Sequence, residues 1–556
     1  MAATTKDGYR WATLGDLDAF FGLMLDNVTI LVLFSSILSG VFGFPLEFIF
    51  TKMLPGTALA VLIGDLAYTA MAFKIAKRTK NPNFTAMPLG LDAPSTIGMA
   101  FIILGPAYIA TGHNAELTWY IGMSSMFFIG ILKIIFSFFA QSIQKAIPQS
   151  GLLGSLAGIG IALLCFMQLV EIFKMPVVGL ISMGIIFFTV MAKIKLPKRL
   201  PGIFIAVFVG TVVYYITGHY GLLGLSEFKV PELVLRFAFP LPNFSFIQGF
   251  KDAIPYLPIA LPFGFLTIIG GINVTESARL TGDEFKTRDV ILVDGLATII
   301  GSICGGVAQS TPYIGQPAYK AMGARAAYTL ATGLFIGLGG MLGYISFVVD
   351  FIPAPAVAGI IVFVGLEILS QAFHVCPVRH YTAIGLAFMP TFADLILIQL
   401  DNYRGQMMGA LYNTPGIPEI LAKTPLVLPH EIINSITVIT ALAHGFIITG
   451  MLWGAILTFM IDREFYKASL TLVITGALTF FGIIHSVLPT GGLYLPWKID
   501  ASVPGNTYPY YLTAAYLSFA LVLFILKNIT SEEQLNTLLN DDQEPVPKEQ
   551  VLGVQA

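Results

Sequence analysis

The sequence predicts an all-α polytopic membrane protein, folded as an inverted repeat with a broken third and a broken tenth segment. Three observations lead to this prediction. Charged residues make up 11% of the 556 residues, against about 25% in soluble globular proteins. The mean hydropathy is +0.80, and many apolar runs are about 20 residues long, the length that crosses a hydrocarbon core of about 30 Å. Proline and glycine interrupt two of these runs at corresponding places.

The composition and the motifs exclude several classes of function. A net charge of −2 offers no basic surface for nucleic acid. The cysteines Cys165, Cys304 and Cys376 lie far apart and form no CxxC pair, so neither a disulfide framework nor a metal site is indicated. HExxH, GxSxG and Walker sequences are absent. We therefore expect no enzyme activity, no cofactor, no metal and no nucleic-acid partner.

Sixteen apolar segments organise the chain. They lie near 18–41, 53–74, 91–111, 117–141, 151–171, 175–193, 202–218, 254–276, 289–305, 316–325, 327–351, 355–373, 380–400, 432–460, 468–489 and 509–527. We expect a cytoplasmic N-terminus (1–17), a first repeat (18–218), an external loop (219–253), a second repeat (254–460), two extra transmembrane helices (461–527) and a disordered cytoplasmic tail (528–556). The residues before the first segment lack the apolar region of a cleavable signal peptide.

The distribution of lysine and arginine predicts the orientation. Basic residues cluster after even-numbered segments, as in 74–80 and 193–199, whereas the loops 112–116, 306–311 and 352–354 contain none. Cytoplasmic loops carry the excess of positive charge in membrane proteins. We therefore expect both termini in the cytoplasm and a multi-pass protein in the bilayer of a plasma or bacterial inner membrane.

The third and tenth segments predict the functional site. Their interruptions are Pro88, Gly90 and Pro94 in the third segment, and Pro312, Gly315 and Pro317 in the tenth. Because proline lacks a backbone donor, each segment should begin as a short strand, pair antiparallel with the other, and turn helical partway. Irregular backbone at membrane depth occurs where it is buried or lines a cavity, and paired broken segments indicate a transporter site. The alternative is two ordinary helices that tolerate their prolines.

Four motifs carry a resemblance to a known family. IPQSGLLGSLAGIGIALL (147–164) looks like an IPRS…AGIG signature, and MPLGLDAP (87–94) is similar to PGMGLNA, with Asp92 in place of Asn. LVDGLATIIGSICGG (292–306) resembles LADAxGTxxGAxxG, and 313–325 resembles a tenth-segment motif that ends in Gly–Arg. Over about 15–460 the chain therefore resembles the nucleobase/cation symporter-2 family (xanthine/uracil permease superfamily), closest to its azaguanine-type adenine/guanine/hypoxanthine permeases.

The resemblance implies a fold and a function. The fold is a seven-plus-seven inverted repeat, in which a core domain (segments 1–4 and 8–11) moves against a gate domain (5–7 and 12–14), usually in a homodimer. The function is secondary active, proton-coupled transport of a purine-like nucleobase by an elevator movement. Glu276, followed by TGDE, is instead closer to sulfate-permease-type anion transporters, which share this fold. The alternative substrate is therefore an inorganic or small organic anion.

Four residues are candidates for substrate binding. Asp92 lies where the third half-helix should begin, as a substrate or proton ligand or as a structural N-cap. Gln316 stands near the family's segment-10 carboxylate and can read a purine edge, or it packs against the broken strand. Tyr313 either stacks on a base or packs. Asn273 is a polar group on the eighth segment, where the family's acid is replaced by apolar residues.

Three carboxylates are candidates for proton coupling. Asp26 in the first segment and Asp65 in the second are ionisable groups inside membrane spans, which makes them functional candidates by default. Their alternative role is to hydrogen-bond the two domains together. Glu276 either couples proton movement or forms an i, i+3 pair with Arg279. For Asp294, which matches the family's segment-9 aspartate, we expect a structural role.

Overall fold

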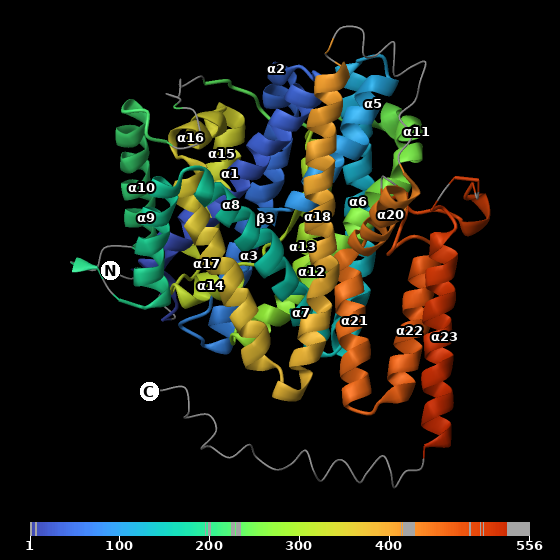
Figure 1. Cartoon of the computed structure of the whole chain (residues 1–556). Coiled ribbons are helices and arrows are strands. Elements are labelled where there is room, and N and C mark those ends of the chain that lie inside the picture. The colour runs from blue at the N-terminus through green and yellow to red at the C-terminus, as the bar shows by residue number, and fades with distance from the viewer. Residues whose placement is uncertain are drawn as a thin grey trace.

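The computed structural model describes residues 3–5, 8–194, 196–197, 202–223, 228, 235–412, 414, 429–488, 491–500, 502–503 and 505–530. This part of the chain is mostly helical, which confirms the predicted fold class (Figure 1). The strands within it form two short pairs, β1 (Ala3–Thr4) with β2 (Arg10–Ala12) and β3 (Leu89–Leu91) with β4 (Ser310–Pro312). The predicted tail from residue 531 and most of the loop 413–428 lie outside the described residues.

The elements of the first half follow the order of the first seven predicted segments. Several are assembled from consecutive shorter helices, some of them π-helical. Their elements are α1 (Gly15–Phe42); α2 (Leu46–Phe48), η1 (Ile49–Met53) and α3 (Leu54–Thr79); β3, α4 (Ala93–Gly98), η2 (Met99–Leu104) and α5 (Gly105–Ala110); α6 (Ala115–Ala146); α7 (Gln149–Ile159), η3 (Gly160–Phe166) and α8 (Met167–Lys174); α9 (Pro176–Ile186) and η4 (Phe187–Met191); and α10 (Gly202–His219).

The second half repeats this order and adds two helices. A short helical lead, η6 (Phe244–Gly249), α11 (Phe250–Ala253) and η7 (Ile254–Tyr256), precedes it. Its elements are α12 (Leu257–Leu280); α13 (Thr287–Ile303); β4 and α14 (Gln316–Ala321); α15 (Ala327–Leu342) and α16 (Ile345–Phe351); α17 (Ala354–Val375); η8 (Val378–His380) and α18 (Tyr381–Tyr412); α20 (His430–Ala443) and α21 (Phe446–Ile461); then α22 (Phe465–Phe480), η9 (Pro496–Lys498) and α23 (Tyr508–Ile529).

Two predicted segments differ from the structure. The segment predicted at 432–460 is not one straight helix, because α20 and α21 meet at an angle of 76°. Gly445 lies at this bend with φ +75°, a left-handed conformation that interrupts a helix. The segment predicted at 468–489 ends earlier, at Phe480, and Gly482 follows with φ +70°.

Helix length and composition support a membrane location. Within the described residues, seven helices are long and apolar enough to span a bilayer by themselves, or eight if the bent α20–α21 pair counts as one span. Of the other predicted spans, α1 and α12 are single long helices, whereas the broken third and tenth segments are built from shorter consecutive elements. The chain is a multi-pass membrane protein.

The helices pack in two groups, which we name by their members. In the core bundle, α6 packs against α12 and α13, and α3 against α13 and α15, with α1, α4 and α14 beside them. In the gate bundle, α18 packs against α7, α20 and α21, and α17 against α8, α9 and α10. The bundles touch where α1 meets α10, where α12 meets α7, and where α14 meets α17. The extra helices α22 and α23 lie together at one edge, against α21 (Figure 1).

A buried polar cluster fixes α23 to the gate bundle. The Tyr516 hydroxyl accepts a hydrogen bond from Trp453 Nε1 at 2.8 Å and lies 2.7 Å from His485 Nε2. His485 Nδ1 is 2.8 Å from the Ala441 carbonyl, to which it donates. With that proton on Nδ1, Nε2 is the acceptor for the Tyr516 hydroxyl. The cluster therefore satisfies polar groups of α20, α21, α23 and the turn after α22 at once.

We expect Tyr516→Phe to lower the thermal stability of the detergent-solubilised protein. The substitution leaves the Trp453 and His485 nitrogens without partners, at a cost of about 1–3 kcal/mol for a buried unsatisfied group. Tyr511→Phe, on the exposed face of the same helix, is the matched control. The measurement is the midpoint of thermal unfolding. Equal midpoints for the two variants would show that the cluster adds no stability.

Candidate functional site

The two broken segments cross as predicted. β3 and β4 pair antiparallel, with Leu89 opposite Pro312, Gly90 opposite Thr311 and Leu91 opposite Ser310. Gly90 is required here, because a Cβ at this position would lie 2.7 Å from the ring of Tyr313. α4 leads away from one strand and α14 from the other. We call this pair of strands the strand crossing.

Asp92 begins α4 as its N-cap. Its Oδ2 accepts a hydrogen bond from the Ser95 amide at 2.9 Å, and the Ser95 hydroxyl bonds to the same oxygen. The Asp92 amide donates to the Gln309 carbonyl at 2.9 Å, which ties the third segment to the tenth. Asp92 therefore has the geometry of a structural N-cap, the second of its two predicted roles. It lies at the start of the half-helix, where we expect a substrate to bind.

Acceptors from neighbouring helices hold the backbone of β3. The Leu89 amide donates to Asp65 Oδ1 at 2.9 Å, and the Leu91 amide donates to Asn27 Oδ1 at 2.8 Å. Both acceptor side chains are completely buried. They satisfy amides that a continuous helix would have satisfied internally. Asp65 Oδ2 is also buried and has no hydrogen-bond partner.

A lysine that the sequence analysis did not single out holds the backbone of β4. Lys133 on α6 is completely buried, and its ammonium group lies 2.8 Å from Asp294 Oδ2. It donates to the Ser310 carbonyl at 2.6 Å and to the Thr298 hydroxyl at 3.3 Å. The Ser310 hydroxyl donates to Asp294 Oδ1 at 3.1 Å. The available signal was a charged residue in the middle of the apolar segment 117–141.

Tyr313 and Gln316 are engaged by other parts of the protein. The Tyr313 ring stacks on Tyr319, with ring centroids 6.1 Å apart, and its hydroxyl bonds to Asp26. The Gln316 amide nitrogen donates to Asp283 Oδ2 at 2.9 Å, in the loop after α12. Burial raises the pKa of Asp283, and the Lys320 ammonium, 2.6 Å away, opposes that rise. Gln316 is thus directed at this loop.

Asn273 and Glu276 lie between α12 and its neighbours. The Asn273 amide nitrogen donates to the Ser155 hydroxyl on α7 at 2.9 Å, which joins the two bundles. Arg279 binds both Glu276 oxygens, at 2.9 and 2.6 Å, which is the i, i+3 pair considered above. Gln144 also donates to Glu276, at 2.8 Å. The structure therefore places Asp92, Tyr313, Asp26 and Asp65 around the strand crossing, and Glu276 in an ion pair.

Several buried polar atoms near the strand crossing lack partners. The Gln309 amide nitrogen donates to the Thr267 hydroxyl at 2.6 Å and to the Phe263 carbonyl at 3.3 Å, which leaves Oε1 without a donor. Asn273 Oδ1 and the Thr96 hydroxyl are likewise unpaired. On the gate helix α18, Asp394 Oδ2 is unpaired and interacts electrostatically with Asp92. Neither Gln309 nor Asp394 is among the site residues predicted from the sequence. No group of metal-binding side chains occurs in the described residues.

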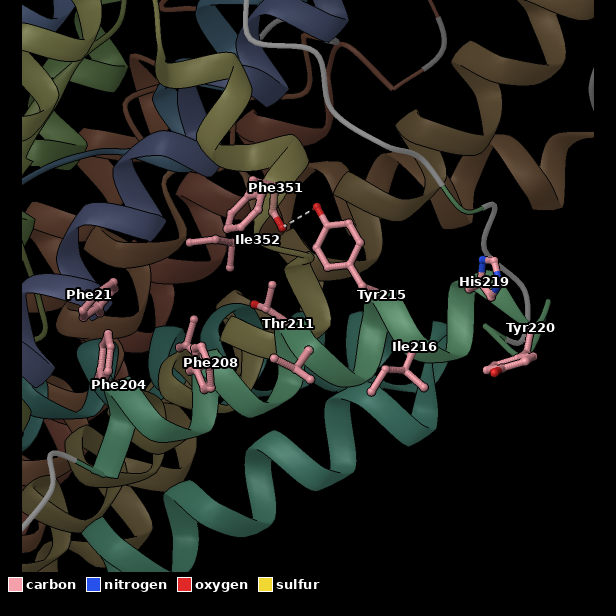
Figure 2. A pocket seen from close by; sticks show the side chains of 12 residues that line it. Phe21, Phe204, Phe208, Thr211, Tyr215, Ile216, His219, Tyr220, Phe351 and Ile352 are labelled. Atoms are coloured by element: carbon pink, nitrogen blue, oxygen red, sulfur yellow. Dashed lines mark hydrogen bonds between the residues drawn. The ribbon is translucent and has the colours of Figure 1, made fainter. Parts of the chain in front are cut away.

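A large cavity lies elsewhere, on the outer side of α10 (Figure 2). It has a volume of about 810 Å³ and an almost wholly apolar lining. Phe204 and Phe208 of α10 line it together with Phe21 of α1 and Phe351 of α16. Figure 2 shows the Tyr215 hydroxyl bonded to the Phe351 carbonyl, at 3.2 Å. The apolar lining of this cavity is suited to contact with the hydrocarbon of a bilayer. None of its lining residues belongs to the strand crossing.

Comparison with solved structures finds membrane transporters. The transmembrane domain of the cyanobacterial bicarbonate transporter BicA aligns with a TM-score of 0.42 and 17% identity, over 69% of this chain and 96% of that one. SLC26A9 aligns with a TM-score of 0.40 and 13% identity, over 67% of this chain and 62% of that one. No protein-family profile matches the chain, and no curated protein does. The resemblance to nucleobase permeases thus gains no support from these comparisons.

Proposed function

We propose that the protein is a secondary active transporter whose substrate binds at the strand crossing. One observation carries the proposal, namely that two interrupted segments, far apart in sequence, meet as paired strands from which half-helices lead away. In a membrane protein such backbone is stable where it is buried in protein or lines a polar cavity. Sites built from discontinuous helices are typical of transporters with internal repeats.

Alternating access would come from movement of the core bundle against the gate bundle. Among the described residues, hydrogen bonds join the two bundles between Asn273 and Ser155, between Gln149 and Glu276, and between Ser277 and Gln371. Four residues hold β3 and β4 at the strand crossing, and all of them belong to the core bundle. They are Asn27, Asp65, Lys133 and Asp294. The site would therefore travel with the core as a unit, as in an elevator mechanism.

A small anion is the substrate class that we favour. The nucleobase interpretation uses Tyr313 and Gln316, but the Tyr313 ring is buried and stacks on Tyr319, and the Gln316 amide nitrogen is bound to Asp283. The N-terminal end of the α4 half-helix, the positive end of its dipole, lies beside the strands, whereas the charge of Lys133 is compensated by Asp294. A co-transported proton would offset the charge of the anion in this low-dielectric setting.

A purine-like nucleobase is the second candidate, and a different observation favours it. Gln309 Oε1 and Asn273 Oδ1 are buried acceptors without donors. The Phe263 carbonyl can only accept, so the orientation of the Gln309 amide is fixed by its partners. A heterocycle with ring and amino N–H groups would satisfy such acceptors, whereas a simple anion such as sulfate would not.

Uptake into proteoliposomes tests the proposal and separates the two candidates. Purified protein would be assayed with sulfate, bicarbonate and fumarate, and with adenine, guanine, hypoxanthine and xanthine, with and without an inward proton gradient. Anion uptake supports the first candidate, and purine uptake supports the second. A thermal-shift panel gives an independent readout, because a ligand at 100 times its Kd stabilises by about 2.7 kcal/mol. If none of these solutes is taken up and none gives a thermal shift, the result contradicts both candidate functions.

A further inference from the structure

Two buried aspartates occupy corresponding places in the two halves. Asp65 lies on α3, the second segment of the first half, and Asp294 lies on α13, the second segment of the second half. In each helix a threonine four residues later donates to the aspartate's own carbonyl, Thr69 at 2.7 Å and Thr298 at 2.8 Å. This local arrangement is thus the same on both helices.

The two aspartates also bind corresponding points of the strand crossing. Asp65 accepts from the amide of Leu89, and Asp294 accepts from the hydroxyl of Ser310. Each of these residues directly precedes the central pair, Gly90 opposite Thr311. A two-fold rotation through that central pair would therefore exchange Leu89 with Ser310. The inverted repeat gives each half one carboxylate behind its own broken segment.

The two carboxylates differ in how their charge is compensated. Asp294 forms an ion pair with Lys133, whose ammonium group lies 2.8 Å away. Asp65 is paired with no lysine or arginine of the described residues, and its Oδ2 has no hydrogen-bond partner. Both side chains are essentially inaccessible to solvent. Lys133 lies on α6, the fourth segment of the first half, and pairs with the carboxylate of the second half, whereas no described lysine takes the corresponding place beside Asp65.

Among the described residues, the titratable groups that interact with Asp65 offer it no positive charge. Tyr68 of its own helix, Tyr319 of α14 and Tyr328 of α15 are the titratable groups that interact with it, and Asp294 on α13 lies beyond Tyr68. Gly333 of α15 packs directly on it, since a Cβ there would lie 2.9 Å from Asp65 Cβ. An isolated ionised carboxylate is strongly disfavoured in such surroundings, and it becomes neutral by binding a proton.

We propose that Asp65 is the binding site of the coupling proton. Asp294 is the corresponding carboxylate of the second half, and the Lys133 ammonium group permanently compensates its charge. This inference rests on the proposed transport function. With the proton bound, β3 is backed by a neutral acid, and an anion can occupy the strand crossing. After the proton leaves, a negative charge lies directly behind β3 and repels the anion. Proton and substrate binding then favour each other reciprocally.

Asp65→Asn tests the inference, because asparagine keeps the acceptor for the Leu89 amide but cannot bind the proton. We expect this variant to exchange substrate across the membrane at equal pH while losing accumulation driven by a proton gradient. We also expect the substrate Kd of this variant to be independent of pH. In wild type, one coupled proton weakens substrate binding about tenfold for each pH unit above the midpoint of proton binding. Thr332→Val, which removes a buried unpaired hydroxyl on the facing helix, is the matched control and should retain the wild-type pH dependence.

The possible results separate this inference from the proposed function. Proton-driven accumulation by Asp65→Asn with wild-type pH dependence would overturn the role of Asp65 and leave the transport function intact. Failure of wild type to bind or transport any anion or purine would overturn the function itself. If Asp65→Asn does not fold, Asp65→Glu decides, since it retains a titratable group in altered geometry. A shifted pH midpoint in that variant supports the inference, and an unchanged midpoint contradicts it.

Discussion

Replacement of Lys133 by methionine is expected to destabilise the protein strongly and to abolish transport. Methionine retains the length of the side chain but removes the ammonium group that compensates Asp294 and binds the Ser310 carbonyl. Breaking a buried ion pair from one side costs about 3–5 kcal/mol, because the remaining charge is left uncompensated. The backbone of β4 also loses the donor that fixes it. Thermal unfolding midpoints and uptake by reconstituted protein measure the two effects.

A double variant identifies the cause of the Lys133→Met effect. Lys133→Met combined with Asp294→Asn leaves no uncompensated charge, and the asparagine oxygen can still accept from the Ser310 hydroxyl. We expect this pair to recover most of the thermal stability, whereas transport stays low because the Ser310 carbonyl remains unbound. A single Lys133→Met variant as stable as wild type would show that Asp294 is neutral in the native protein and that no ion pair exists.

Asp92→Ala is expected to reduce uptake more than tenfold at unchanged membrane abundance, with a modest loss of stability. The loss of an N-cap costs about 0.5–2 kcal/mol, here from the start of α4 at the strand crossing. Transport suffers more, because the proposed substrate site uses the end of this half-helix. Quantitative immunoblotting of membranes together with initial uptake rates measures both properties.

Asp92→Asn separates the capping role of this residue from its charge. Asparagine caps helices about as well as aspartate, so the variant should unfold at nearly the wild-type temperature. If it also transports normally, Asp92 is a structural N-cap and its charge has no part in transport. Full uptake by Asp92→Ala would remove the residue from the site altogether.

The amino-acid sequence by itself determined the class of the protein and the two broken segments at which we propose the site. The thickness of a bilayer sets the length of an apolar span, so the spans can be counted without any knowledge of tertiary structure. Proline removes a backbone donor wherever it stands, so the strands at 89–91 and 310–312 could be predicted from Pro88, Gly90 and Pro312. The pair of Glu276 with Arg279 was also accessible, because residues three apart share one face of a helix.

Only the tertiary structure decided which buried polar groups have partners. Lys133 meets Asp294, and Gln316 meets Asp283, across segments whose relative position no local pattern encodes. The same is true of the unpaired oxygens of Asp65 and Asp394, since a carboxylate in a membrane span is equally conspicuous in sequence whether or not a lysine lies beside it. The free energy of a buried charge depends on the few atoms around it, and packing of distant helices supplies those atoms.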